Sequence, residues 1–240
     1  MKKGLLVTNI LLGLSVVLIP LALYWNLLVA PTEAVMGHAQ RIFYMHLPMW
    51  AVTFTAYFGA FVFGILYLWK GKPIWDYLGA AWVEVGVLFN CAGLLTGMIW
   101  AKYAWGTWWQ WDPRLTATFI MWFLYVGYLL LRLSIENPNT RAKMCAILSV
   151  IAFLDIPIIV VSVRQWRGIH PNVLKGPNQM ELDPVMKQAL LLSVLAFWAL
   201  GLAIIGIRSA LATAEMKLEQ LKAERQADSA GAELGEAKPA

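Results

Sequence analysis

Charged residues are scarce in this sequence: Asp, Glu, Lys and Arg make up only 14% of its 240 residues. A soluble domain carries about 25% charged residues, whereas 60% of this chain is hydrophobic and its mean hydropathy is +0.63. That composition argues against a disordered chain and, despite a net charge of +5, against a nucleic-acid binder. It predicts an integral protein of the lipid bilayer.

Cysteine is almost absent as well. Cys91 and Cys145 both lie in or against apolar runs, and no Cys-x-x-Cys pair occurs. The sequence therefore offers no disulfide framework, no dithiol redox motif and no covalent c-type heme attachment site. We interpret both cysteines as small buried apolar residues.

Long apolar runs dominate the chain instead. About 20 apolar residues cross the hydrocarbon layer of a membrane as a helix. Six stretches qualify, namely Leu5–Leu28, Leu47–Trp69, Gly79–Trp100, Leu115–Leu133, Met144–Val163 and Gln188–Ile207. We predict an all-α integral membrane protein, a bundle of six transmembrane helices within residues 1–208.

Basic residues set the expected orientation. Lys2 and Lys3 precede the first span, and the two short connections, near 70–78 and 134–143, are denser in basic residues than the three longer ones. By the positive-inside rule, both termini are expected in the cytoplasm. The three longer loops, near 29–46, 101–114 and 164–187, then face outward and contain every histidine.

The last segment, 209–240, differs from the rest in composition. It is rich in charge and is expected to form a cytoplasmic tail that follows the membrane domain. Pairs such as Glu219 and Lys222 favour a helix up to about Arg225. The Ala/Gly/Glu composition beyond Gln226 predicts disorder.

Tryptophan is concentrated in the second long loop. Four of the thirteen tryptophans, Trp105, Trp108, Trp109 and Trp111, lie within seven residues. An aromatic belt at the membrane interface is one interpretation. On a helix, however, Trp105, Trp108, Trp109 and Asp112 would share one face and form a flat platform for a planar apolar ligand. The sequence leaves both interpretations open.

Two histidines flank this loop on the same side of the membrane. His46 lies at the mouth of the second span and His170 lies past the end of the fifth. Imidazole is a common axial ligand of heme iron, and two such ligands must approach from opposite faces. Arg41, Arg114 and Arg164 are candidates for pairing with heme propionates, or with lipid headgroups. His38 is interpreted as an ordinary loop residue.

Two acids fall within the apolar spans, where a charge is costly. Glu84 lies near the inner end of the third span and is expected to reach the interface. Asp155 lies near the middle of the fifth, two residues before Pro157. We interpret Asp155 as stabilising packing or a proline kink rather than relaying protons.

The segment from Trp105 to Thr116 resembles the tryptophan-rich WWD signature of membrane proteins that handle heme. Within that superfamily the chain resembles the CcmC family of cytochrome c maturation, over roughly residues 5–208. The similarity includes Phe43–Pro48 before the second span, Asp155–Pro157 in the fifth, and Ser162–Trp166 leading to His170.

The resemblance implies a site for heme b, held non-covalently and transiently at the periplasmic face of the bacterial inner membrane. His46 and His170 match the axial ligands of the heme iron in that family. The residues matching those that contact the macrocycle are Trp105, Trp108, Trp109, Trp111 and Asp112.

The resemblance also implies a non-enzymatic scaffold that delivers heme to a periplasmic chaperone of the CcmE type. A small single-span peptide of the CcmD type and ATP-binding-cassette subunits of the CcmA and CcmB types are the other expected partners. Two alternatives are a heme transporter or exporter subunit and a heme lyase. The absence of histidine within any predicted span disfavours the lyase, and Asp155 alone offers a transporter a polar centre.

Overall fold

The computed structural model describes residues 2–34, 36–165 and 183–236. Across these ranges the chain forms helices joined by short connections, and no strand is present apart from an isolated bridge between Glu33 and Gly37. Six helical segments are long and apolar enough to cross a membrane. The prediction of an all-α, six-span membrane protein is therefore confirmed.

The helices follow one another in a simple order. α1 continues into a short π-helical turn, η1, and the 3-10 turn η2 leads directly into α2. The bounds are α1 Lys2–Tyr24, η1 Trp25–Val29, η2 His38–Ile42, α2 Phe43–Lys70, α3 Pro73–Trp105, α4 Pro113–Ser134, α5 Pro138–Phe153, α6 Asp155–Gln165 and α7 Pro184–Glu236.

Proline marks the beginning of four helices. The first residues of α3, α4, α5 and α7 are Pro73, Pro113, Pro138 and Pro184. Proline suits this position because the first N–H of a helix has no intrahelical acceptor. Asp112 and Asn137 cap α4 and α5 by accepting hydrogen bonds from backbone N–H groups, at 2.9 Å from Arg114 in the first case. These starts lie several residues before the apolar runs that predicted the spans.

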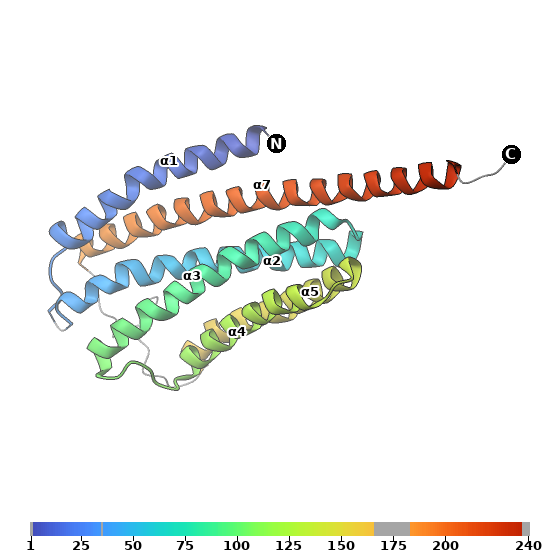
Figure 1. The fold of residues 1–240 in the computed structure, drawn as a ribbon. Helices are drawn as coiled ribbons and strands as arrows, with labels where there is room; N and C mark the ends of the chain where they lie inside the picture. Colours follow the sequence, from blue (N-terminus) through green and yellow to red (C-terminus); the bar gives the residue numbers. More distant parts are fainter. Residues whose placement is uncertain (1, 35, 166–182, 237–240) are drawn as a thin grey trace.

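The helices form a bundle with two distinct ends (Figure 1). α2 and α3 lie at its centre, α1 packs along α7 on one side, and α4, α5 and α6 pack on the other. Both termini lie at one end, together with the α2–α3 and α4–α5 connections; we call this the terminal end. The opposite end, called the loop end, carries the α1–α2 and α3–α4 connections, the last residues of α6 and the start of α7.

Glycines on α3 let its backbone approach α2 closely. A Cβ atom built on Gly86 would lie 2.4 Å from Tyr57, one on Gly93 would lie 3.1 Å from Trp50, and one on Gly97 would lie 2.9 Å from His46. Small residues drive helix association in membranes because backbones and large side chains can then pack closely. This face of α3 therefore sets the positions of aromatic rings on α2.

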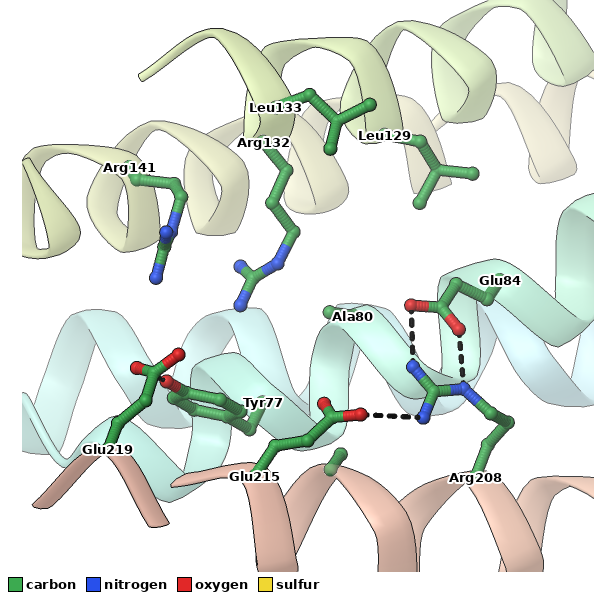
Figure 2. Close-up of a pocket in the computed structure, with 11 residues that line it drawn as sticks. Tyr77, Ala80, Glu84, Leu129, Arg132, Leu133, Arg141, Arg208, Glu215 and Glu219 are labelled. Carbon is green, nitrogen blue, oxygen red and sulfur yellow. Dashed lines mark hydrogen bonds and ion pairs between the residues drawn. The ribbon is translucent and has the colours of Figure 1, made fainter. Parts of the chain in front are cut away.

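Ion pairs hold the terminal end together. Arg132 on α4 binds both carboxylate oxygens of Asp76 on α3, at 2.6 and 2.8 Å. Arg208 on α7 binds Glu84 in the same bidentate way, at 2.6 and 2.9 Å, and lies 3.5 Å from Glu215 (Figure 2). Glu84 therefore does more than reach the interface: its charge is paired within the bundle.

The fifth span is interrupted where the sequence placed an acid beside a proline. α5 ends at Phe153 and α6 begins at Asp155. Pro157 lacks the N–H that would bond the carbonyl four residues earlier, so the helix cannot continue undisturbed. Asp155 is only 9% exposed at this break, and its Oδ2 is buried without a hydrogen-bond partner among the described residues, so its stabilising role stays a prediction.

The tail is helical over a longer stretch than expected. α7 runs to Glu236, past Gln226, where the composition predicted the onset of disorder. The segment 209–236 is rich in Ala, Glu, Lys and Gln, which have high helix propensities, and it continues a helix already formed in the bundle. Its last turns extend beyond the other helices (Figure 1).

Candidate functional site

His46 lies in the first turn of α2, at the loop end. Its Nδ1 is 3.1 Å from the hydroxyl oxygen of Thr96 on α3. That hydroxyl donates its only hydrogen to the Ala92 or Gly93 carbonyl, at 2.8 and 3.0 Å, so it accepts a hydrogen bond from His46 Nδ1–H. The Trp50 indole donates to His46 Nε2 at 3.0 Å. This network assigns a neutral imidazole whose lone pair is on Nε2.

The tryptophan segment is a loop, so the one-faced helix considered for a platform does not form. α3 ends at Trp105, where Gly106 adopts a left-handed conformation with φ 75° and donates to the Lys102 carbonyl. Residues 107–112 are not helical, and Pro113 begins α4. A glycine that ends one helix and a proline that begins the next prevent a continuous helix through the motif.

The tryptophans of this segment pack against different partners. Trp109 and Trp111 pack edge to face, with ring centroids 5.8 Å apart, and both lie near Phe119 of α4. The ammonium nitrogen of Lys102 lies over the ring of Trp108, 6.0 Å from the ring centroid. Trp105 instead packs against Trp100. A flat platform made from one face is therefore replaced by aromatic walls around two cavities.

Two neighbouring cavities lie at the loop end. The smaller, of about 20 Å³, is next to His46 and Trp50 and is lined by Trp108 and Trp109. The larger, of about 350 Å³, is an apolar groove between α3 and α4, lined by Cys91, Leu94, Leu95, Met98, Trp109, Trp111, Phe119 and Trp122. Leu94, Met98 and Trp109 line both, so these three side chains separate the imidazole from the groove.

Two tryptophans in the walls of the groove have buried N–H groups without acceptors in the described part of the chain. Among the residues that the structure describes, the buried indole N–H groups of Trp109 and Trp122 make no hydrogen bond. A buried donor left in this way is costly. Neither N–H opens into the groove, whose surface is apolar throughout.

The remaining predicted residues contribute in other ways. Asp112 is 7% exposed and caps α4. Arg41 on η2 donates to the carbonyls of Asn26 and, at 3.1 Å, Ala30, so it joins η2 to η1 and its C-terminal cap. Trp105, Asp112, Arg41 and Arg114 line neither cavity. His38 is exposed on η2.

His170 lies outside the described residues. The structure therefore shows one of the two predicted axial ligands, and it shows where the chain leaves and re-enters the described region. α6 ends at Gln165 and α7 begins at Pro184, both at the loop end.

Sequence reasoning missed several residues of the site. Trp50 follows His46 by four residues on a helix, a spacing that could have signalled contact between the two rings. Thr96 and Gly97 come from a different helix, and no local pattern marks them. Phe119 and Trp122 were hidden within an apolar span, where aromatic residues are expected as packing.

Together, the bundle and its aromatic end define a class: a multi-pass helical membrane protein with an apolar, tryptophan-lined groove beside a neutral histidine. Comparison with known proteins gives the family. Residues 3–224 match the family model described as CcmC, Heme exporter protein C. The chain belongs to this family, and the predicted resemblance is confirmed.

Individual relatives agree with this assignment. Heme exporter protein C of Escherichia coli (strain K12) is 32% identical over 189 residues, covering 78% of this chain and 76% of the relative. Heme exporter protein C of Haemophilus influenzae is 36% identical, with 65% of this chain and 64% of the relative covered. An Arabidopsis thaliana protein named as a putative cytochrome c biosynthesis ccmC-like mitochondrial protein is 34% identical, with coverages of 71% and 64%.

Proposed function

We propose that this protein binds heme at the loop end of the bundle and delivers it for cytochrome c maturation. The observation that carries the proposal is the Nε2 lone pair of His46, next to a tryptophan-lined cavity and one wall away from an apolar groove. The family description and the names of the relatives supply the cargo, since they refer to heme export and cytochrome c biosynthesis.

The residues of the groove fit a flat, largely apolar macrocycle. Its volume of about 350 Å³ is at the lower end of the range for small-molecule sites, about 300–1,000 Å³. Indole faces stack on planar rings, and four aromatic side chains, Trp109, Trp111, Phe119 and Trp122, line the groove. His46 would supply one axial nitrogen to the iron, and His170 is proposed to supply the second.

The charged groups of heme require partners of their own. Arg114 follows Asp112 at the start of α4 and remains a candidate for a propionate. Arg41 is the other candidate, and it would first have to release the Asn26 and Ala30 carbonyls that it now binds. Trp105, Trp108, Trp109, Trp111 and Asp112 are proposed to contact or support the macrocycle.

The proposed role is that of a carrier without a catalytic step. Heme b would be held non-covalently, because the chain has no Cys-x-x-Cys-His attachment motif. We propose that the loop end faces the periplasm of a bacterial inner membrane, where a chaperone of the CcmE type receives the heme. A CcmD-type peptide and CcmA- and CcmB-type subunits are the further proposed partners.

Movement of heme across the membrane is the second candidate, because the family description is that of an exporter. It would require a passage from the terminal end to the loop end. The described cavities lie at the two ends of the bundle, and those at the terminal end are lined by ion-paired residues. Delivery from the loop end therefore remains our first proposal.

The test is an absorption spectrum of the detergent-purified protein titrated with hemin. We expect a Soret band with low-spin bis-imidazole features, which His46→Ala and His170→Ala each diminish strongly. His38→Ala is the matched control and should leave the spectrum unchanged. A wild-type protein without a Soret band, or a His46→Ala variant with a normal one, would overturn the proposal.

A further inference from the structure

We propose that Trp50 competes with heme iron for the Nε2 atom of His46 and thereby lowers the affinity of the site for its cargo. The inference rests on the proposed function, because it assigns a role to a second residue of the same site. In the heme-free protein the Trp50 indole N–H caps the nitrogen that would ligate iron, at 3.0 Å.

The competition follows from the number of lone pairs on the ring. A neutral imidazole has one nitrogen that carries hydrogen and one that accepts. The Thr96 hydroxyl fixes the hydrogen on Nδ1, so Nε2 holds the only available lone pair. That lone pair either accepts the Trp50 N–H or binds a metal. Iron ligation therefore requires the indole hydrogen bond to break.

Both rings are held in place by α3. A Cβ on Gly97 would lie 2.9 Å from His46 Cε1, and a Cβ on Gly93 would lie 3.1 Å from the Trp50 ring. The two side chains thus pack against neighbouring glycines, one turn apart on α3, and their separation is determined by the backbones of α2 and α3. The hydrogen bond between them is a built feature of the helix pair.

The space beside the pair makes the competition steric as well as electronic. The cavity lined by His46 and Trp50 has a volume of about 20 Å³, close to the space that one water molecule needs. Heme can reach Nε2 only if Trp50 turns away or the wall of Leu94, Met98 and Trp109 moves. Loading is therefore coupled to displacement of side chains that return when heme leaves.

Such a cap suits a carrier that must release its cargo. On release, the re-formed hydrogen bond offsets part of the loss of the iron–nitrogen bond. One neutral hydrogen bond changes an equilibrium by about two- to twelvefold. We therefore expect Trp50 to weaken hemin binding by a factor in this range, mainly by increasing the rate of dissociation.

The first test uses the heme-free protein. Diethyl pyrocarbonate modifies the unprotonated nitrogen of a neutral imidazole, and the modification of each histidine can be followed by peptide mass spectrometry. Trp50→Phe keeps an aromatic ring but removes the N–H, so His46 should react several times faster than in the wild type, while His38 serves as an internal reference. Trp198→Phe removes an indole N–H that bonds Thr55 at 3.1 Å instead, and it should leave His46 unchanged.

The second test measures hemin affinity and transfer to excess apomyoglobin. Trp50→Phe should bind hemin about two- to twelvefold more tightly and release it correspondingly more slowly. Trp50→Leu removes the same N–H with a smaller side chain and should shift both quantities in the same direction. A Trp50→Phe protein that matches the wild type in both His46 reactivity and hemin release would overturn the inference.

Failure of the proposed function has a different signature. If His46→Ala keeps a normal Soret band, the ligand assignment is wrong, whatever Trp50 does. If His46→Ala loses the band while Trp50→Phe behaves as the wild type, heme binding stands and only the competition is rejected.

Discussion

At the scale of single residues, the orientation of His46 depends on a partner that is distant in sequence. Thr96 lies 50 residues further along the chain and accepts the Nδ1–H. The position of His46 at the mouth of a span was predictable from the sequence. The hydroxyl that sets its tautomer was not, because the contact exists only once α2 and α3 pack together.

We expect Thr96→Val to weaken hemin binding by about 10- to 100-fold, the usual cost of removing a hydrogen-bond partner from a metal-ligating histidine. Valine keeps the shape of threonine but cannot accept the Nδ1–H, so the imidazole loses its fixed tautomer. Hemin titration followed at the Soret band measures the effect. Thr55→Val on α2, whose hydroxyl bonds Ala51 and Trp198, is the matched control and should bind hemin normally.

Trp109 and Trp105 belong to the same motif but differ in what they line. Trp109 lines both cavities, whereas Trp105 packs against Trp100. We expect Trp109→Ala to weaken hemin binding by about tenfold or more, since a stacked aromatic pair contributes about 0.5–1.5 kcal/mol beyond the area it buries. Trp105→Ala should weaken binding less than Trp109→Ala does, because Trp105 supports the site through Trp100 and lines neither cavity. Equal losses in the two variants would contradict the cavity assignment.

At the scale of helices, the apolar pattern predicted the number of spans correctly. It placed the beginnings of the helices too late in the sequence. The hydrophobic run of the third span begins at Gly79, while α3 begins at Pro73. The missing signal was in the sequence: Lys72-Pro73, Asp112-Pro113, Asn137-Pro138 and Asp183-Pro184 each place a proline at the first helical position. The same signal at Asp112-Pro113, with Gly106 before it, separates the tryptophan loop from the helices and explains why a helical platform does not form.

The α2–α3 pair gives a prediction at this scale. Gly97→Ala would place a methyl group 2.9 Å from His46 Cε1, so the imidazole or the helix must shift. We expect a moderate destabilisation of about 1–3 kcal/mol, typical of overpacking, together with reduced hemin binding. Thermal unfolding in detergent and hemin titration measure the two effects. Gly127→Ala on α4 has open space around the new methyl group and should change neither.

At the scale of the whole molecule, the two ends of the bundle divide their tasks. The terminal end is fastened by bidentate ion pairs from α3 to α4 and from α3 to α7. Figure 2 shows the second of these, between Glu84 and Arg208. The loop end holds an apolar groove and the capped imidazole of His46. The sequence showed which charges lie near the ends of spans. It did not show how they pair, because Asp76 and Arg132 come from helices whose packing is determined only in the folded bundle.

The two ion pairs should contribute very differently to stability, because their burial differs. The side chains of Arg132 and Asp76 are 16% and 4% exposed, whereas those of Arg208 and Glu84 are 27% and 38% exposed. Arg132→Ala leaves a buried, unpaired carboxylate and should cost about 3–5 kcal/mol. Glu84 lies near the end of its span, so stranding its charge by Arg208→Ala should cost less than the ~2.5 kcal/mol of a charge at the centre of a span.

Unfolding midpoints of the two variants in the same detergent test this ranking, and a double variant, Asp76→Asn with Arg132→Gln, tests its cause. If the cost of Arg132→Ala arises from the stranded charge, the double variant should recover part of the lost stability, since it removes both charges together. Because these residues are at the opposite end from His46, each variant that folds should keep the hemin affinity of the wild type. A folded Arg132→Ala protein with impaired hemin binding would contradict this division of tasks and show that the two ends are coupled through α3.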